Sequence, residues 1–143
     1  MSYCVTDDVS SEFKSIEFNS DSPVTDDKVT EFIAQADAFI DGKLTLKYAT
    51  PITGAKSLLT IKTISIWLVA DRVSKILQVK SATESTNTAE KSLRQMALDL
   101  LKDILDGKFS LSDATPASTG SGFKSYANDN DLDYTFHSGT DEW

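Results

Sequence analysis

The side chains that could support catalysis are few, and they lie far apart in the sequence. His137 is the only histidine in 143 residues, and Cys4 is the only cysteine. A hydrolytic triad needs a base that its neighbours hold rigidly beside the nucleophile, whereas His137 lies in a C-terminal stretch without helical or strand periodicity. Neither a GxxxxGK[ST] nor a GxGxxG nucleotide-binding sequence occurs. We therefore predict no catalytic residues, no cofactor and no enzymatic activity; a small helical enzyme with an unfamiliar site is the open alternative.

Three alternating aspartates, Asp129, Asp131 and Asp133, resemble the opening of a calcium-binding loop. Such a loop requires glycine at its sixth position and a bidentate glutamate at its twelfth. This chain has Tyr134 and Thr140 there. The run is therefore better explained as a solvated acidic segment, and the lone cysteine provides no paired-thiol zinc site. No metal site is predicted.

The C-terminal stretch, residues 112–143, is polar and acidic, yet it is rich in aromatic residues. A disordered tail is ordinarily poor in aromatics, and rings spaced along an acidic segment suit an arm that is loose alone and becomes ordered on a partner. A frayed end with incidental aromatics is the alternative. The predicted partner-binding residues of the arm are Phe123, Tyr126, Asp129, Asp131, Asp133, Tyr134, Phe136 and Trp143.

The charge of the chain narrows the choice of partner. The net charge is −8, and six carboxylates against Lys124 give −5 over residues 112–143. This excess argues against non-specific binding to nucleic acid or to an anionic membrane. A basic protein surface is the expected dock for the arm, with an affinity that falls as salt rises. No apolar run approaches the length of a membrane span, and residues 1–20 do not resemble a secretory signal.

Two helices are expected in the first third of the chain. Thr6 and Thr25 are each followed by two aspartates, the composition of a helix start. After Thr25, apolar residues recur at steps of three and four up to Leu44, which predicts a helix with one buried face. Gly42 lies inside this pattern and suggests a kink or a close helix contact.

Two further helices are expected before the arm. Residues 57–77 are the most apolar part, and their helical spacing predicts a central helix buried on most sides, with Trp67 and Leu68 at its middle. A polar loop follows, and Asn87 with Glu90 forms a capping-box-like start for a helix over residues 93–105. Gly107 ends it. The predicted fold is all-α: a small bundle of about four helices over residues 1–111, with an extended arm over 112–143.

The order of several short sequences along this chain resembles that of the tailed-phage head–tail connector proteins related to the Mu-like gp36 group. The sequences are YCVTDDV at 3–9, IDGKLTLKYATP at 40–51, ADR at 70–72 and ILDGKFSL at 104–111. They correspond to a YxTxDDL-like start, an ID-x-x-L-x-x-x-Y-x-x-P stretch and a final helix ending in GK-x-x-L. The resemblance covers roughly residues 3–111 and leaves out the polar segment 78–90 and the arm.

The resemblance implies a structural role in the virion. It implies that residues 1–111 form a helical connector domain and that twelve copies form a ring under the portal protein. Such a ring extends the channel for the genomic DNA, which passes through without specific binding, and receives the next neck or tail-terminator protein below. The C-terminal arms of such proteins clasp the portal. The protein is then made in the bacterial host cytoplasm and ends in the neck of the virion, with no membrane partner.

One other class of binding protein stays open. A small acidic helical protein can imitate nucleic acid and inhibit or regulate a basic partner. Copurification with a polymerase or a nuclease would favour this alternative, and association with the capsid would favour the connector.

Overall fold

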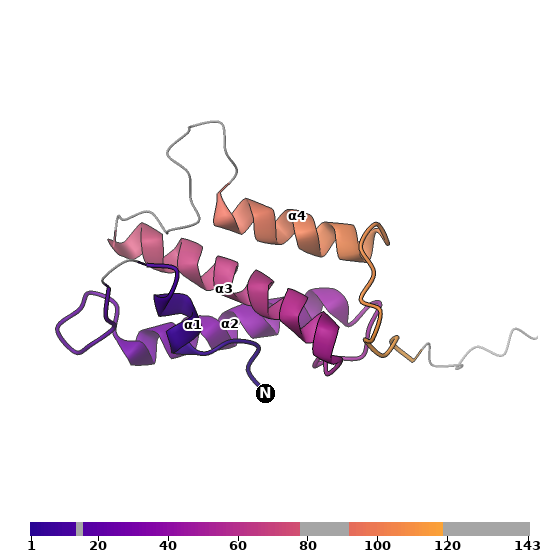
Figure 1. Ribbon diagram of the computed structural model, residues 1–143, viewed down its shortest axis with the longest axis horizontal. Coiled ribbons are helices and arrows are strands. Elements are labelled where there is room, and N and C mark those ends of the chain that lie inside the picture. Colours follow the sequence, from indigo (N-terminus) through magenta and orange to yellow (C-terminus); the bar gives the residue numbers. More distant parts are fainter. Residues whose placement is uncertain (14–15, 78–91, 119–143) are drawn as a thin grey trace, which may run out of the picture.

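The computed structural model describes residues 1–13, 16–77 and 92–118, and the regular structure in these ranges is entirely helical (Figure 1). The four helices are α1 (Thr6–Ser10), α2 (Asp26–Leu44), α3 (Ala55–Leu77) and α4 (Leu93–Leu105). The predicted all-α fold is confirmed. Within these ranges there is no strand, only one isolated antiparallel bridge between Tyr48 and Pro116. None of the described helices is long and apolar enough to cross a membrane.

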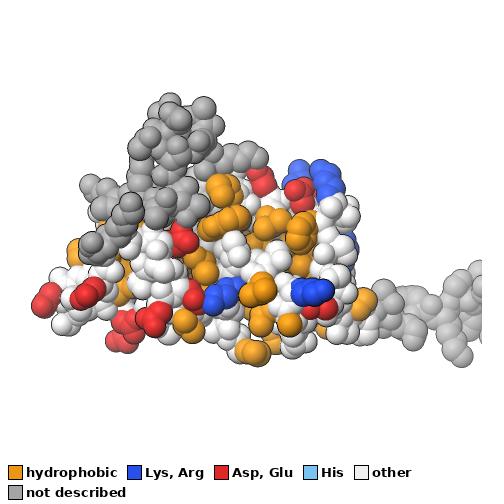
Figure 2. Space-filling model, viewed as in Figure 1, with side chains coloured by type: hydrophobic (Ala, Val, Ile, Leu, Met, Phe, Trp, Pro, Cys, Tyr) orange, Lys and Arg blue, Asp and Glu red, His pale blue; other side chains and the backbone are white. Residues whose placement is uncertain are grey.

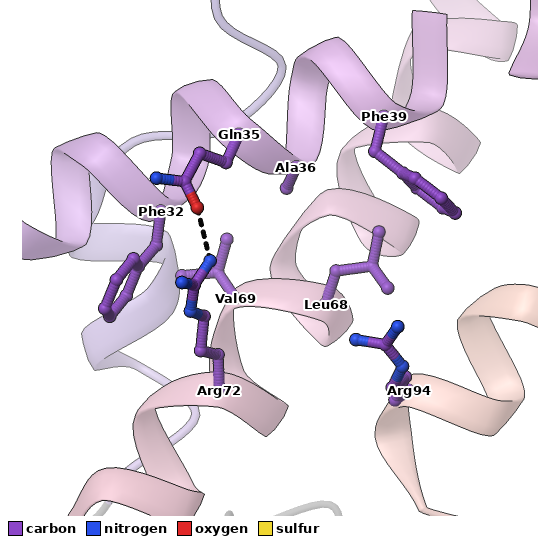
Figure 3. Close-up of a pocket in the computed structure, with 8 residues that line it drawn as sticks. All are labelled: Phe32, Gln35, Ala36, Phe39, Leu68, Val69, Arg72 and Arg94. Carbon is purple, nitrogen blue, oxygen red and sulfur yellow. Dashed lines mark hydrogen bonds between the residues drawn. The ribbon is translucent and has the colours of Figure 1, made fainter. Parts of the chain in front are cut away.

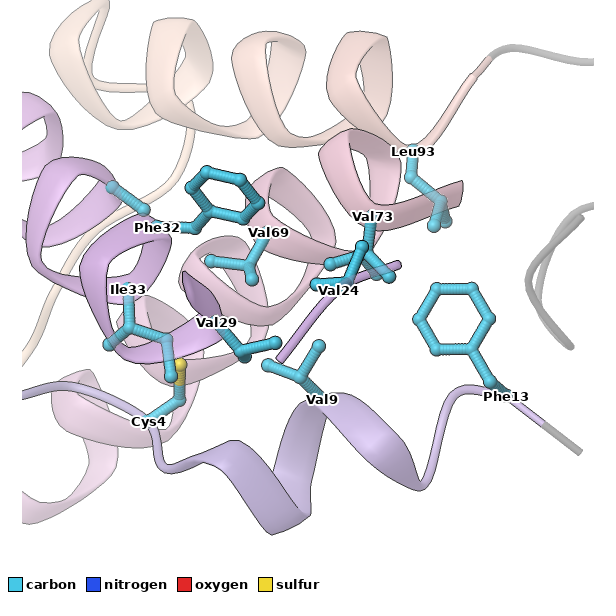
Figure 4. Packing of buried hydrophobic residues seen from close by; sticks show 12 residues of the cluster. Cys4, Val9, Phe13, Val24, Val29, Phe32, Ile33, Val69, Val73 and Leu93 are labelled. Carbon is cyan, nitrogen blue, oxygen red and sulfur yellow. The ribbon is translucent and has the colours of Figure 1, made fainter. Parts of the chain in front are cut away.

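Helix α3 is the centre of the bundle. It packs against α4 on one side and against α1 and α2 on the other (Figure 1). Two hydrophobic clusters fill the contacts, one around Val9, Val29 and Val73 (Figure 4), and one around Ile40 and Ile64. Both clusters contact the partly buried Trp67 and Leu68, so the bundle has one continuous core.

Helix α2 follows its predicted pattern. Thr25 is its N-cap residue. The apolar residues of the predicted stripe are all buried, namely Val29, Phe32, Ile33, Ala36, Ile40 and Leu44. The suggestion of a close helix contact at Gly42 is wrong: the helix continues through it to Leu44, and the Cβ of a side chain at this position would meet nothing within 4 Å. Gly42 lies on the exposed face, where no neighbour demands a small residue.

Helix α3 is less enclosed than its composition indicates. Ile61, Ile64, Val69 and Val73 are fully buried, but Leu59 is 67% exposed. Trp67 and Leu68 are only partly buried, so the expectation that α3 is buried on most sides is wrong. For Leu68 the reason is geometric, because α2 and α4 leave an open groove between them that Leu68 lines.

The helix ends correct some predicted caps. The N-cap of α1 is Val5, not Thr6; the backbone N–H of Val5 donates to the Asp8 carboxylate at 3.0 Å. Ser92 caps α4 by accepting from the Gln95 backbone N–H at 3.3 Å, while the predicted start at residues 87–90 lies outside the described ranges.

Gly107 ends α4 as predicted, with φ of +78°. The Lys108 N–H donates to the Asp103 carbonyl at 2.9 Å, and the Gly107 N–H donates to the Ile104 carbonyl at 3.3 Å, which together form a Schellman motif. Leu111 then folds back into the core, whereas Phe109 is 41% exposed.

The first residues after Ser112 lie against the helical bundle. The Ala49 N–H donates to the Thr115 carbonyl at 2.8 Å, and the Ala117 N–H donates to the Lys47 carbonyl at 3.0 Å. Lys47 in turn donates through Nζ to the Ile104 carbonyl at the end of α4, at 2.8 Å. The segment up to residue 118 is thus fastened between the end of α2 and the end of α4.

Candidate functional site

The predicted partner-binding residues of the arm all lie in residues 119–143, outside the part of the chain that the structure describes. They are Phe123, Tyr126, Asp129, Asp131, Asp133, Tyr134, Phe136 and Trp143. Their role stays a prediction. The described residues contain three polar arrangements that sequence reasoning missed: a buried carboxylate at the N-terminus, a carboxylate at the start of α3, and a groove with two arginines.

The first arrangement is centred on Asp37, which is buried in the middle of α2. Its Oδ2 accepts from the Ser2 hydroxyl at 2.7 Å and from the Tyr3 backbone N–H at 3.1 Å. Its Oδ1 accepts from the Ser65 hydroxyl of α3 at 2.8 Å. One carboxylate therefore joins α2, α3 and the N-terminal segment.

Tyr3 extends this arrangement along α2. Its hydroxyl donates to the Asp41 carboxylate and accepts from the Ile52 backbone N–H at 2.9 Å. Burial, reinforced by the hydrogen bond to Asp41, raises the pKa of the Tyr3 hydroxyl above its usual value. The ring thus stays neutral and ties the N-terminal segment to the connection between α2 and α3.

Cys4, Ser65 and Asp37 form a chain of a thiol, a hydroxyl and a carboxylate that invites comparison with a nucleophilic site. Cys4 Sγ lies 3.3 Å from Ser65 Oγ. Burial raises the pKa of the Cys4 thiol to about 11, so it is protonated at neutral pH, and the thiol is not the reactive form. With Cys4 only 3% exposed, these residues hold the fold together and do not present a nucleophile to a substrate.

The second arrangement is the carboxylate of Asp113 at the N-terminus of α3. It accepts from the backbone N–H groups of Lys56 at 2.7 Å and Ser57 at 2.8 Å, and from the Ser57 hydroxyl. These hydrogen bonds, that from the Ser57 hydroxyl foremost, lower the pKa of Asp113. Free N–H groups at a helix start favour an anion, so Asp113 serves α3 as a cap supplied from a distant part of the chain.

Gly54 makes this cap possible. A Cβ at position 54 would collide with the Asp113 backbone carbonyl and side chain. Only a residue without a side chain leaves room for the segment after α4 to lie against the start of α3.

The third arrangement is a groove of about 230 Å³ between α2, α3 and the first turn of α4 (Figure 3). We call it the arginine groove. Figure 3 shows Phe39 of α2, Leu68 of α3 and Arg94 of α4 converging on one side of it, and Arg72 on the other. Its lining residues are Phe32, Gln35, Ala36, Phe39, Leu68, Val69, Arg72 and Arg94.

The two arginines give the arginine groove its chemistry. The Arg72 guanidinium lies over the Phe32 ring, 4.2 Å from its centroid, and donates to the Gln35 side-chain carbonyl. Neither Arg72 nor Arg94 forms an ion pair with a described carboxylate. They are the only arginines in the chain, whose other cationic side chains are lysines. Arginine suits planar, two-pronged binding of carboxylates and stacking on rings, so the groove can hold an acidic group beside an apolar one.

One face of the molecule has an apolar middle and an acidic end. Figure 2 shows hydrophobic side chains gathered over α3 and α4 in the middle of one face, and acidic side chains gathered at the end where α2 begins. Of the exposed large hydrophobic residues, Phe39 belongs to the arginine groove. Among the described residues no group of three or more potential ligands could hold a metal ion.

The comparisons with known proteins support the resemblance to the Mu-like gp36 group. The family model described as "Bacteriophage Mu, Gp36" matches residues 3–125, a range that includes all four helices. No curated protein matches the chain. The family indicates a bacteriophage protein and suggests association with the virion.

Proposed function

This chain belongs to the bacteriophage Mu Gp36 family, and from that premise we propose that it is a head-to-tail connector subunit. In this role, copies form a ring between the portal protein and the downstream neck or tail-terminator protein. The ring extends the channel through which the genomic DNA passes. The family match over residues 3–125 carries the proposal, because it covers the whole helical bundle.

The described structure supports a role in assembly. Asp37 and Asp113 fasten the N-terminal segment and the segment after α4 to the same bundle, which gives a firm body. The arginine groove, whose two arginines form no ion pair with a described carboxylate, suits a carboxylate-bearing protein segment. Subunits that join by one patch on one copy and a different patch on the next close into a ring when the rotation permits.

The charge also suits a channel. With a net charge of −8, the wall of a ring built from this chain repels DNA phosphates, so DNA slides through without binding. The expected partners are those that the resemblance to the connector proteins implies: the portal protein, other copies in a twelvefold ring and the next neck protein.

The location of the protein tests this function. A phage with a stop codon early in the gene should fill its heads with DNA but fail to join them to tails, and the wild-type gene supplied in trans should restore joining. Cryo-electron microscopy of restored particles should show the protein as a ring below the portal. Particles that lack the protein yet join heads to tails normally would refute the proposal. Copurification with a basic enzyme, together with absence from particles, would favour the inhibitor.

The same complementation assay tests the arm. A chain that ends at residue 119 keeps the Asp113 contacts and should keep its helical circular dichroism, but it should not restore head-to-tail joining. Replacement of Tyr134 and Phe136 by alanine should weaken attachment of the protein to the capsid by about 1–4 kcal/mol, the usual range for residues that anchor an interface. Normal yields of infectious particles from the shortened chain would show that the arm is an incidental tail.

A further inference from the structure

The structure leads from the arginine groove to a specific occupant. We propose that the groove of one copy binds the acidic aromatic segment of the arm, residues 129–136, from a second copy. The inference rests on the proposed function to the extent that a connector ring requires contacts between copies. It goes further by identifying the two surfaces in contact, which are the arginine groove of one copy and residues 129–136 of another.

The groove has the features that recognise a carboxylate next to a ring or an aliphatic side chain. Leu68 and Phe39 supply apolar surface, and Phe39 is 38% exposed. Arg72 and Arg94 reach this surface from two different helices, α3 and α4. Both guanidinium groups lack a described acidic partner, although the chain has 22 acidic residues against 14 basic ones. In such a chain, two arginines without a carboxylate at one apolar groove indicate that an outside carboxylate binds there.

The arm contains the matching sequence. Residues 129–136 read DNDLDYTF and supply three carboxylates together with Leu132, Tyr134 and Phe136. Over residues 119–143, five carboxylates stand against one lysine, which favours approach to a positive groove. Outside the arm, the acidic stretch with aromatic residues around Phe13 and Phe18 is already used, because those two rings pack edge to face at the core.

The direction of the chain favours a second copy over the chain's own arm. The last described residues lie where α4 ends (Figure 1), held by the contact of Ala117 with Lys47. Arg94 lies in the first turn of α4, at the opposite end of that helix. The groove of the same chain therefore lies at the far end of α4 from residue 118. The groove of a neighbour can lie anywhere within reach of the 25 residues after residue 118, which extend up to about 80 Å. An arm and a groove on different surfaces form a head-to-tail contact, the kind that builds rings.

Paired variants of the full-length chain test this inference by sedimentation velocity over a range of concentrations. In the groove variant, Arg72→Gln and Arg94→Gln remove the cations. In the arm variant, Asp131→Asn, Asp133→Asn and Tyr134→Ala remove the ligand. The wild type should associate with rising concentration, and each variant alone should associate at least tenfold more weakly. An equimolar mixture of the two variants should form a two-chain complex, because the groove variant still has an intact arm and the arm variant an intact groove.

Controls separate this contact from general charge effects and from folding defects. Lys28→Gln with Lys102→Gln removes two exposed cations from outside the groove and should associate as the wild type does. Each variant should show wild-type helical circular dichroism. Replacement of both arginines by lysine keeps the charge, loses the planar two-pronged contact, and should give intermediate association.

Three results would overturn the inference. The first is a wild type that is monomeric at every concentration, in which Arg94 is protected from a dicarbonyl reagent only while the arm is intact. This result would place the arm in the groove of its own chain. An arm variant that associates as the wild type does would exclude the arm as the occupant. In the third result, the arm variant fails to bind purified portal protein, the groove variant binds it normally, and neither variant loses self-association. This result would assign the arm to the portal. None of these results bears on whether the protein is in the virion, which the particle assay decides separately.

Discussion

Removal of the Asp37 carboxylate should release the N-terminal segment from the bundle. Asp37 accepts from the Ser2 hydroxyl, the Tyr3 N–H and the Ser65 hydroxyl. Ser2 is exposed, so water replaces its contact at little cost. The bonds from Tyr3 and Ser65 are buried, and they determine the size of the effect.

The two substitutions Asp37→Asn and Asp37→Ala should differ in cost. In the asparagine variant the amide oxygen still accepts from Tyr3, and the amide nitrogen donates to Ser65, whose hydroxyl turns to accept. Only the strengthening by charge is lost, about 1–2 kcal/mol over the two bonds. In the alanine variant the Tyr3 N–H and the Ser65 hydroxyl lose their partner in a buried site. At about 1–3 kcal/mol for each of these two unsatisfied groups, we expect a loss of about 2–6 kcal/mol.

Denaturant unfolding and thiol labelling together measure this prediction. Unfolding followed by circular dichroism gives the free energy of unfolding for each variant. Labelling of Cys4, the only thiol, reports release of the N-terminal segment, because Cys4 is buried and its raised pKa keeps it protonated. Asp37→Ala should label much faster than the wild type under native conditions. Asp27→Asn, the same charge change at an exposed position of α2, should change neither quantity appreciably.

The reasoning fails if Asp37→Ala unfolds within about 0.5 kcal/mol of the wild type, the range of an ordinary surface substitution. It also fails if stability falls while Cys4 labels at the wild-type rate. That second result would mean that Asp37 supports α2 and α3 but does not hold the N-terminal segment.

Three further predictions concern the core and the cap of α3. Ile64→Ala should lower the free energy of unfolding by about 2–5 kcal/mol, because Ile64 is fully buried. Leu68→Ala should lower it by less than about 2 kcal/mol, because Leu68 borders the open groove. Equal losses in denaturant unfolding would contradict the placement of α3. Gly54→Ala should lower the melting temperature and expose the segment after α4 to proteolysis, since the added methyl group collides with Asp113; an unchanged protein would mean that this segment does not lie there. The hydrogen bonds lower the pKa of Asp113 from its ordinary value of 3.8. The stabilisation from the charged Asp113 is therefore complete above pH 3.8 and is lost as the pH falls through the folded-state pKa. Melting temperatures measured from pH 5 to pH 3 should fall less steeply for Asp113→Asn than for the wild type.

The helices could be predicted from the sequence because local periodicity determines them. The apolar stripe that ends at Leu44 and the stripe that ends before Gly107 each gave the correct helix. The degree of burial could not be predicted in the same way. Leu68 has the sequence surroundings of a core residue, yet its exposure depends on the space between α2 and α4, which no local pattern specifies.

The polar contacts were missed because they join residues distant in sequence. One of them had a local signal: Asp37 falls on the apolar face of α2, between Ile33 and Ile40, where a charge requires buried partners. Asp113 and Arg72 had no such signal, because each is exposed in its own segment and gains its role only when α3 meets another part of the chain. The only hint of the groove was that the chain has just two arginines.

The attachment of the arm to the bundle determines how the protein responds to tension. A pull on the arm first strains the Ala117–Lys47 hydrogen bond, then the Thr115–Ala49 hydrogen bond, and only then the contacts of Asp113. These bonds lie in series and open one after another, and each opening lengthens the tether by a few residues, at about 3.3–3.6 Å per residue. The buried Leu111 lies between Asp113 and α4 in the chain, so it must also leave the core before the pull reaches α4. A pull on the arm must therefore break these contacts in order, at one end of the bundle, before it can distort the helices.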